Sequence, residues 1–264
     1  ISNEQRTTSY KYDCENRITE IDYSPINQLP LTKYEYAPYG KRIMFCPFGK
    51  RTKKIDSTGT NYYLHDEENI LLELDNNGNT IRNYTTTLAV DEIISMFDEH
   101  NQEYYYLYDG TGSVRMLTDK YGDILQVYDY DVFGKPNVTT KDKNPYKFTA
   151  REYDQDSAIY YYRARYYDPA TGRFMQKDSE EGSYETPKSL HKFSYVENNP
   201  VNYKDPFGLA WEDLHYVIAT WFDDEVTSTG ISAKNPDVLG VALPSTTVKR
   251  KWVIVMDKGK CKKV

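Results

Sequence analysis

The chain has 264 residues, a net charge of −7 at pH 7 and a mean hydropathy of −0.79. The negative charge argues against a general nucleic-acid-binding surface, and no apolar run of roughly eighteen residues is present to cross a membrane. The sequence contains 27 tyrosines but only 9 phenylalanines. Tyrosine in such excess suits β-strands, whose rings pack together while the hydroxyls reach water or the backbone. This aromatic content also argues against a disordered chain.

The three cysteines, Cys14, Cys46 and Cys261, lie far apart in the sequence. Their odd number and wide spacing indicate neither a disulfide framework nor a metal site, so we expect ordinary thiols and no metal or other cofactor. The chain begins at Ile1 without a methionine or a signal peptide, and we interpret it as a piece of a longer protein.

A short unit recurs along the chain. It begins with two aromatic or apolar residues separated by one position. A turn residue and then a run of alternating apolar residues follow them. The copies are Tyr10–Ile21, Tyr34–Ile43, Leu72–Ile81, Tyr106–Leu117 and Tyr128–Lys135. The Tyr-x-Tyr pattern places two rings on one face of a strand, and the Asp, Asn and Gly after it favour a tight turn. One hairpin alone would be marginally stable, so the units must stack. The repeats therefore predict an extended, twisting β-sheet of short strands.

Other segments depart from this rhythm. For residues 83–98, periodicity does not decide between a short helix and a pair of strands. Residues 136–145 and 176–190 are polar and predict surface loops. Beyond Leu209 the composition changes. There, helically spaced apolar residues predict a helix over 211–222, and 248–256 is predicted to be a strand, which together indicate a small α/β segment.

Two Asp-Pro turns, each followed by a glycine, close the tyrosine-rich region. The first runs from Asp168 to Gly172, and the second from Asp205 to Gly208. The change of composition directly after Leu209 indicates a scaffold, a junction and a separate cargo. The junction is therefore where we expect chemistry.

The repeated units resemble YD repeats, and residues from about 104 to 209 resemble the Rhs-repeat-associated core domain. The resemblance of the core rests on Gly112–Asp119, Tyr128–Gly134, Asn144–Asp154, Tyr160–Phe174 and Asn198–Leu209. We therefore expect YD repeats over 1–103, the core domain over 104–209 and a variable, effector-like segment over 210–264.

The resemblance implies a bacterial polymorphic-toxin scaffold that is secreted or held at the cell surface. In that family the YD hairpins spiral into a hollow β-sheet shell, the core domain plugs one end, and the C-terminal segment is held inside as a toxin. The implied partners are the chain's own C-terminal segment as cargo, an immunity protein and components of a secretion machinery. The expected fold is thus mainly β.

The core domain of that family is an aspartyl autoprotease, which implies a cut between Leu209 and Ala210. Peptide hydrolysis needs a base to activate water and an acid to protonate the leaving nitrogen, and two close carboxylates can divide these roles. Asp205 is the first candidate, because it lies four residues before Leu209. Gly208 would give the turn its backbone freedom, and Pro206 fixes φ.

The second carboxylate is expected from an earlier Asp-Pro-x-Gly of the family. The corresponding stretch here is Lys177–Gly182, in which serine replaces the proline. Asp178 is our candidate, 27 residues (205 − 178) before Asp205. Glu180 or Glu181 could substitute for it.

The remaining residues of the junction have supporting roles in this interpretation. Asp168 and Gly172 form a turn, and Pro200 belongs to the Asn-Asn-Pro that begins the final motif. Arg173 comes directly after the first turn and could orient a carboxylate. Asp-Pro and Asp-Gly pairs are common in turns, so all of these aspartates could instead only shape the backbone. Self-cleavage and a purely structural plug both stay open.

The tail and the tyrosine ladder each have two interpretations. Residues 210–264 are short for an enzyme with its own core. His215, Asp223, Asp224 and Glu225 are residue types of metal-dependent nucleases, but their spacing favours a solvated acidic segment, and nucleic acid is expected only if the tail is a nuclease. The tyrosines could also belong to a non-catalytic cell-surface repeat protein that binds carbohydrate, or another cell, through its rings.

Overall fold

The computed structural model describes residues 8–23, 31–36, 50–137, 143–179, 182, 184–185, 187–210, 212–213, 219–222, 250–257 and 260–263. The chain divides into two compact units, Ile1–Glu212 and Asp213–Val264. From residue 211 onward only backbone elements are described. Within these residues no helix is long and apolar enough to span a membrane.

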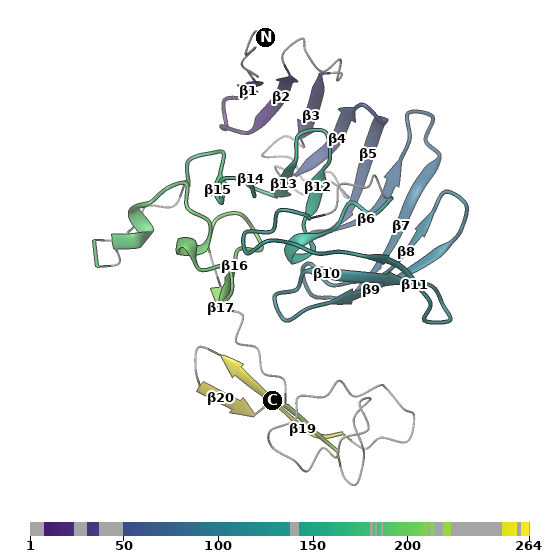
Figure 1. Ribbon diagram of the computed structural model, residues 1–264, viewed down its shortest axis with the longest axis vertical. Coiled ribbons are helices and arrows are strands. Elements are labelled where there is room, and N and C mark those ends of the chain that lie inside the picture. Colours follow the sequence, from purple (N-terminus) through teal and green to yellow (C-terminus); the bar gives the residue numbers. More distant parts are fainter. Residues whose placement is uncertain are drawn as a thin grey trace. The chain divides into compact units, whose positions relative to one another are not determined.

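Among the described residues, eleven strands form one antiparallel sheet in which each strand pairs with its neighbours in the sequence. They are β1 (Thr8–Tyr12), β2 (Ile18–Tyr23), β3 (Thr32–Tyr36), β4 (Arg51–Asp56), β5 (Gly59–Asp66), β6 (Asn69–Leu74), β7 (Thr80–Thr86), β8 (Ile93–Asp98), β9 (Glu103–Tyr108), β10 (Val114–Thr118) and β11 (Ile124–Val127). Figure 1 shows this long sheet curving from β1 to β11. The predicted sheet of short, stacked hairpins is confirmed.

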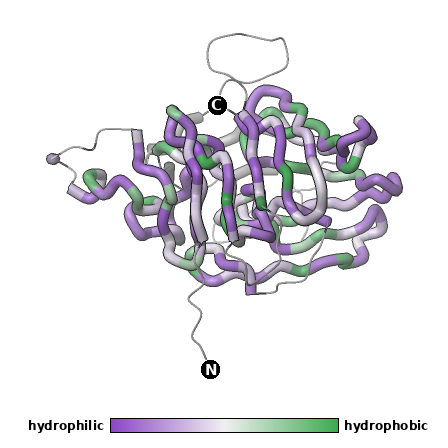
Figure 2. Tube along the Cα trace, turned by 90° about the horizontal axis from the view of Figure 1, so that it is seen from above, coloured by the Kyte–Doolittle hydropathy of each residue, from purple (hydrophilic) through white to green (hydrophobic). Residues whose placement is uncertain are grey.

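Several turns along the described chain share one design. At the β6–β7 turn the Asp75 Oδ1 atom accepts the backbone N–H groups of Asn77 and Asn79, each at 2.8 Å. Gly78 stands between them with φ of +84°, a conformation that glycine adopts without strain. The same arrangement of an aspartate and a positive-φ glycine recurs at Asp109 and Gly112, at Asp119 and Gly122, and at Asp131 and Gly134. Hydrophilic turns between strands of mixed hydropathy are visible in Figure 2.

Residues 83–98 are a strand pair and not a helix. Strands β7 and β8 pair antiparallel, with Tyr84 opposite Met96. Both side chains are buried in the core, at 2% and 0% exposure. Partners on both edges of β8 stabilise the strand form, which a local pattern of apolar residues does not reveal.

Each of the two predicted surface loops contains a buried amide among its described residues. In the loop predicted over 136–145, Asn144 is buried and its Oδ1 accepts the Tyr106 hydroxyl at 2.8 Å. In the loop predicted over 176–190, Gln176 is buried and its Oε1 accepts the Tyr166 N–H at 2.7 Å. Both predictions are wrong at these positions, because a polar amide can enter the core when a buried donor pairs with it.

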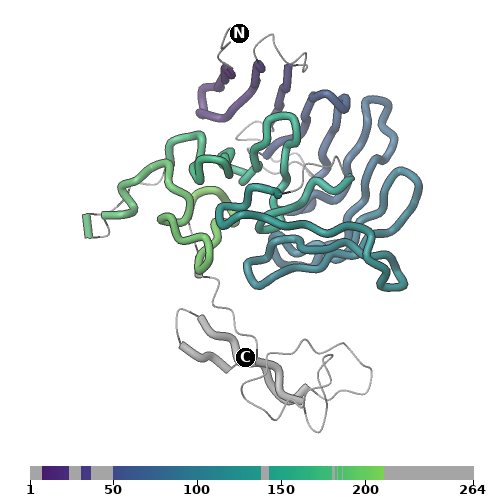
Figure 3. Tube along the Cα trace, viewed as in Figure 1, coloured from purple at the N-terminus to yellow at the C-terminus, as the bar shows by residue number. Residues whose placement is uncertain are grey.

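A second sheet of four strands comes after the long sheet. It contains β12 (Glu152–Asp154), β13 (Ile159–Tyr162), β14 (Arg165–Asp168) and β15 (Arg173–Phe174). Figure 3 traces the chain from β11 back to these strands. We call this sheet together with residues 187–210 the plug, and the long sheet the wall.

Strand β13 is buried along its whole length and packs on both faces. Ile159 and Tyr161 join a cluster with Ile18, Ile21 and Tyr34 of the wall. Tyr160 and Tyr162, on the opposite face, belong to the core of the plug. The Tyr160 hydroxyl donates to the Gly134 carbonyl at 2.8 Å, so the buried ring keeps a partner for its polar end.

Charged residues cross the boundary between wall and plug. Arg51 on β4 is buried, and its Nη1 lies 2.6 Å from Asp154 Oδ2 on β12. Its guanidinium carbon also lies 4.6 Å from the centre of the Tyr161 ring. A buried pair of this kind contributes modestly to net stability, but removing one partner leaves an uncompensated charge. These pairs therefore favour one seating of the plug on the wall.

The remaining elements are short. The 3₁₀ helices are η1 (Phe148–Ala150), η2 (Pro187–Leu190) and η3 (Val196–Asn198), and β16 (Tyr203–Lys204) pairs with β17 (Glu212–Asp213). Cys14 is exposed and unpaired.

In the second unit, the described residues form a three-stranded antiparallel sheet. It contains β18 (Ala219–Phe222), β19 (Arg250–Asp257) and β20 (Lys260–Lys263). The strand predicted over 248–256 is confirmed from Arg250 to Met256, and residues 248–249 lie outside the described residues. The helix predicted over 211–222 is wrong at Ala219–Phe222, where Ala219 pairs with Ile254 and aromatic and β-branched residues favour a strand with a partner. His215, Asp223, Asp224 and Glu225 lie outside the described residues.

Candidate functional site

The segment Asp205–Leu209 repeats the turn design of the wall. Asp205 Oδ1 accepts the Leu209 N–H at 3.0 Å, four residues on, as Asp75 does for Asn79. Gly208 has φ of +69°, and a Cβ atom there would lie 2.3 Å from the Tyr162 carbonyl oxygen. Only glycine fits this position without a shift of the backbone. The Leu209–Ala210 bond lies between β16 and β17 in the chain, and these two short strands pair with each other.

Burial distinguishes Asp205 from the turn aspartates of the wall. Its exposed fraction is 3%. Burial raises the pKa of Asp205 to about 6, against the opposing effects of Arg165 and of the backbone N–H groups of the turn. By contrast, hydrogen bonds from Asn79 lower the pKa of the solvent-exposed Asp75. In the same local turn, the carboxyl group of Asp205 therefore keeps its proton to a higher pH than that of Asp75.

Arg165 on β14 joins the two candidate carboxylates. Its Nη1 lies 2.8 Å from Asp178 Oδ2, and its Nη2 lies 3.4 Å from Asp205 Oδ2. Its Nε donates to the Gly208 carbonyl. A guanidinium presents several donors in one plane, so one side chain can hold both acids and the turn. The Phe174 ring covers it, with the guanidinium carbon 3.7 Å from the ring centre.

Asp178 contacts Nη1 of Arg165, whereas Asp205 contacts Nη2. Its side chain is 17% exposed, and its backbone N–H donates to the Lys192 carbonyl at 3.0 Å. The two carboxylates predicted from the sequence, Asp178 and Asp205, thus contact one guanidinium. Glu180 and Glu181 lie outside the described residues.

Arg173 does not occupy the place expected for it. It is exposed, because Phe174 takes the buried position on the two-residue strand β15. Arg165 contacts the carboxylates instead. The available signal was the Arg-Ala-Arg inside the tyrosine run, since arginine within a strand that is otherwise buried must find a partner there.

The other predicted junction residues shape the backbone. Asp168 Oδ1 accepts the Ala170 N–H and its Oδ2 accepts the Thr171 hydroxyl, each at 2.9 Å. Gly172 closes that turn with φ of +68°. Pro200 and Pro206 are both buried. The Pro206 carbonyl accepts a hydrogen bond from the Arg163 guanidinium.

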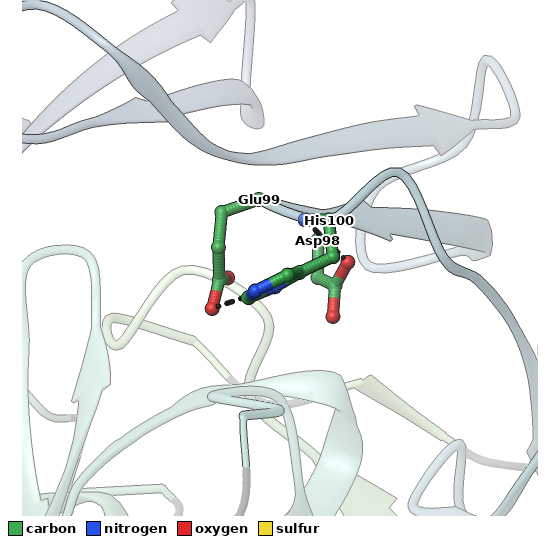
Figure 4. A group of neighbouring side chains, drawn as sticks. All are labelled: Asp98, Glu99 and His100. Atoms are coloured by element: carbon green, nitrogen blue, oxygen red, sulfur yellow. Dashed lines mark hydrogen bonds and ion pairs between the residues drawn. The ribbon is translucent and has the colours of Figure 1, made fainter.

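A cluster of Asp98, Glu99 and His100 resembles a metal site by composition. Figure 4 shows Glu99 beside His100, whose Nδ1 lies 3.3 Å from Glu99 Oε1. However, Lys143 Nζ lies 2.8 Å from Asp98 Oδ2 and 3.0 Å from Glu99 Oε1. One ammonium group already pairs with both carboxylates, and Asp98 also accepts two backbone N–H groups of its own turn. We assign no metal to this cluster.

Comparison with known proteins agrees with the fold. The model of the Teneurin YD-shell family matches residues 78–201. The tRNA3(Ser)-specific nuclease WapA of Bacillus spizizenii is 31% identical over 206 residues, which is 76% of this chain but 8% of that protein. Salivary gland surface protein 1 of Aedes aegypti is 29% identical over 213 residues, covering 73% of this chain and 6% of that protein.

The solved structure of the Tc holotoxin pore of Photorhabdus luminescens has a TM-score of 0.56 and 20% identity, over 76% of this chain and 10% of that one. A curved wall of YD hairpins with a buried plug against it defines a shell-type β protein. The chain belongs to the Rhs, or YD-repeat, family as a segment of such a shell. It spans less than a tenth of the length of the nuclease relative.

Proposed function

We propose that this chain is the plug-bearing end of a shell that encloses and delivers a C-terminal toxin, and that it releases this cargo by cutting itself between Leu209 and Ala210. The observation that supports the cut is the Arg165 bridge between Asp178 and Asp205. The names of the relatives, a tRNA nuclease and a holotoxin pore, support delivery of a toxic cargo. The division at residues 103 and 209 into repeats, core domain and cargo belongs to this proposal.

The proposed chemistry is hydrolysis of one peptide bond. A water molecule transfers a proton to one carboxylate and adds its oxygen to the Leu209 carbonyl carbon. The C–N bond then breaks, and the nitrogen of Ala210 takes a proton from the other carboxyl group. Asp205, with its pKa raised to about 6, is the group we assign as the acid. Asp178 is then the base.

The contacts of the turn also suggest the consequence of the cut. Upstream of Leu209 the turn is anchored, because Arg163 binds the Pro206 carbonyl and Arg165 binds the Gly208 carbonyl. Ala210 is exposed. Cleavage would therefore leave the plug in place on the wall and break the covalent link between the plug and the cargo. Further partners in this proposal are an immunity protein and a secretion machinery, for a protein that is secreted or held at the cell surface.

A second candidate is a non-catalytic surface protein that binds carbohydrate or another cell. The name of the Aedes aegypti relative favours it, as do the exposed rings Tyr10 and Tyr12 on β1. Most tyrosines of the plug are buried, including Tyr160, Tyr162 and Tyr167, so they cannot stack on a sugar. The buried, bridged carboxylates lead us to prefer the cleaving shell.

The test is the intact mass of the purified chain. We expect two fragments, divided between Leu209 and Ala210, and one full-length mass for Asp205→Asn, because loss of a general acid typically slows a reaction about 100-fold or more. Asp168→Asn is the matched control, since Asp168 also shapes an Asp-Pro turn but is not held by Arg165. It should still be cut. An uncut wild type, or a cut Asp205→Asn variant, would refute the proposed cleavage.

A further inference from the structure

Asp91 links the wall to the junction. It lies in the turn between β7 and β8 of the wall and is buried, with 8% of its side chain exposed. Its Oδ1 lies 2.8 Å from Nη2 of Arg163, and its Oδ2 lies 3.2 Å from Nη1. Arg151 also contacts the same carboxylate. Two arginines of the plug region thus converge on one acid of the wall.

Arg163 connects Asp91 with the turn that contains the proposed cleavage site. It stands in the two-residue connection between β13 and β14, with φ of +58°. Besides Asp91, its guanidinium donates to the Pro206 carbonyl, and its carbon lies 5.5 Å from the centre of the Phe207 ring. The next residue, Ala164, donates its N–H to the Phe207 carbonyl at 3.2 Å. The residue after that is Arg165, which holds both candidate carboxylates.

We infer that Asp91 is a positioning residue, through which self-cleavage depends on the seating of the plug on the wall. This inference rests on the proposed self-cleavage. Asp91 touches neither the scissile bond nor Asp178 or Asp205 in the contacts of the described residues, so its effect passes through Arg163. A chain whose wall is incompletely formed would hold its turn loosely and stay uncut, which keeps the cargo attached until the shell is built.

The physical basis is the charge of Arg163. Without the Asp91 carboxylate, Arg163 would keep the Glu68 carboxylate, 3.3 Å from its Nε, and Arg151 would keep that of Glu152, 3.3 Å from its Nη2. Both buried guanidinium groups would lose their closer carboxylate partner. Arg163 would then turn toward other acceptors, and its contact with the Pro206 carbonyl would weaken. A misplacement of about 1 Å in a reacting group typically slows a reaction about 100-fold. The neutral but isosteric Asp91→Asn is therefore expected to slow the cut about 10- to 100-fold.

The experiment measures the rate of cleavage of the full chain during refolding from denaturant. The matched control is Asp154→Asn, which removes another buried carboxylate between wall and plug. Asp154 pairs with Arg51 and not with Arg163. We expect both variants to have a lower Tm, but only Asp91→Asn to be slow. The pH profile of the slowed reaction should keep the wild-type midpoint, because Asp91 does not exchange the catalytic protons.

Three outcomes would overturn the inference. They are wild-type cleavage of Asp91→Asn, equal slowing of both variants, and a shifted pH midpoint. If Asp91→Asn fails to fold, Asp91→Glu, which keeps the charge but displaces it by one methylene, carries the test, and its cleavage at the wild-type rate would count against Asp91. A wild type that is itself uncut refutes the self-cleavage and this inference together, whereas a cut wild type with an unaffected Asp91 variant refutes the inference alone.

Discussion

Arg165 and Asp205 form a buried pair across 40 residues of sequence, with Nη2 and Oδ2 3.4 Å apart. The longer and weaker contact of Arg165 is the one to Asp205, while its 2.8 Å contact goes to Asp178. Burial lowers the pKa of Arg165, although both acids oppose this effect. Burial raises that of Asp205 to about 6, although Arg165 opposes it. A shared cation therefore holds two carboxyl groups that differ in burial, which is the arrangement that acid–base catalysis needs.

The rate of self-cleavage is expected to fall as the pH rises above about 6. Asp205 must carry a proton to act as the acid, and its pKa of about 6 means that the protonated fraction falls about tenfold for each further pH unit. The measurement is the fraction cut against time in buffers from pH 5 to pH 9. Asp168→Asn should give the same profile. A rate that rises between pH 6 and pH 8 would instead identify Asp205 as the base.

Replacing Arg165 by lysine is expected to slow cleavage about 100-fold. A lysine ammonium is a point charge on a flexible stem and cannot hold Asp178, Asp205 and the Gly208 carbonyl together as the guanidinium does. The control is Arg173→Lys, at the exposed arginine that the sequence pattern suggested could orient a carboxylate. It should be cut at the wild-type rate. Equal rates for the two lysine variants would show that the bridge has no part in the reaction.

Gly208→Ala is expected to destabilise the first unit by about 3 kcal/mol or more. The new methyl carbon would lie 2.3 Å from the Tyr162 carbonyl oxygen, in a backbone conformation that favours glycine. Gly78→Ala is the control, because Gly78 also has a positive φ but nothing lies within 4 Å of its added Cβ. Its cost should be about 1 kcal/mol. Urea unfolding of both variants measures the difference, and equal costs would contradict the close packing of the turn.

The first unit is expected to lose stability as the pH falls from about 6.5 to about 4. Burial lowers the pKa of His65 from 6.5 to about 4, so the unfolded chain binds a proton there before the folded one does. Linkage makes this worth up to about 3 kcal/mol, lost on acidification and fully present above pH 6.5.

Thermal unfolding of His65→Gln from pH 4 to pH 7 measures this effect. The variant should have a smaller dependence of Tm on pH than the wild type. The matched control is His100→Gln, since the side chain of His100 is 74% exposed. It should leave the dependence unchanged. An unaltered pH dependence in His65→Gln would show that His65 does not titrate in this way.

Local interactions account for most of the wall. An Asp75-type turn is closed by hydrogen bonds within five residues and by one positive-φ glycine, so the sequence pattern was enough to predict it. The alternation of Tyr-x-Tyr likewise predicted strands, and the family was recognisable from motifs that are contiguous in the chain. Local patterns were not enough for 83–98 or for Ala219–Phe222, where pairing with another strand decides the form.

In the site, too, local patterns predicted some residues, while tertiary contacts decided the others. The Asp205–Leu209 turn is local, and its aspartate and glycine could be chosen from the motif alone. The choice of Arg165 over Arg173 could not, because it depends on which arginine the burial of β14 and β15 turns inward. The contact of Asp91 with Arg163 joins residues 72 apart. Such contacts arise only when the plug is seated on the wall, where the low dielectric and the cost of burying a charge decide which partners must meet.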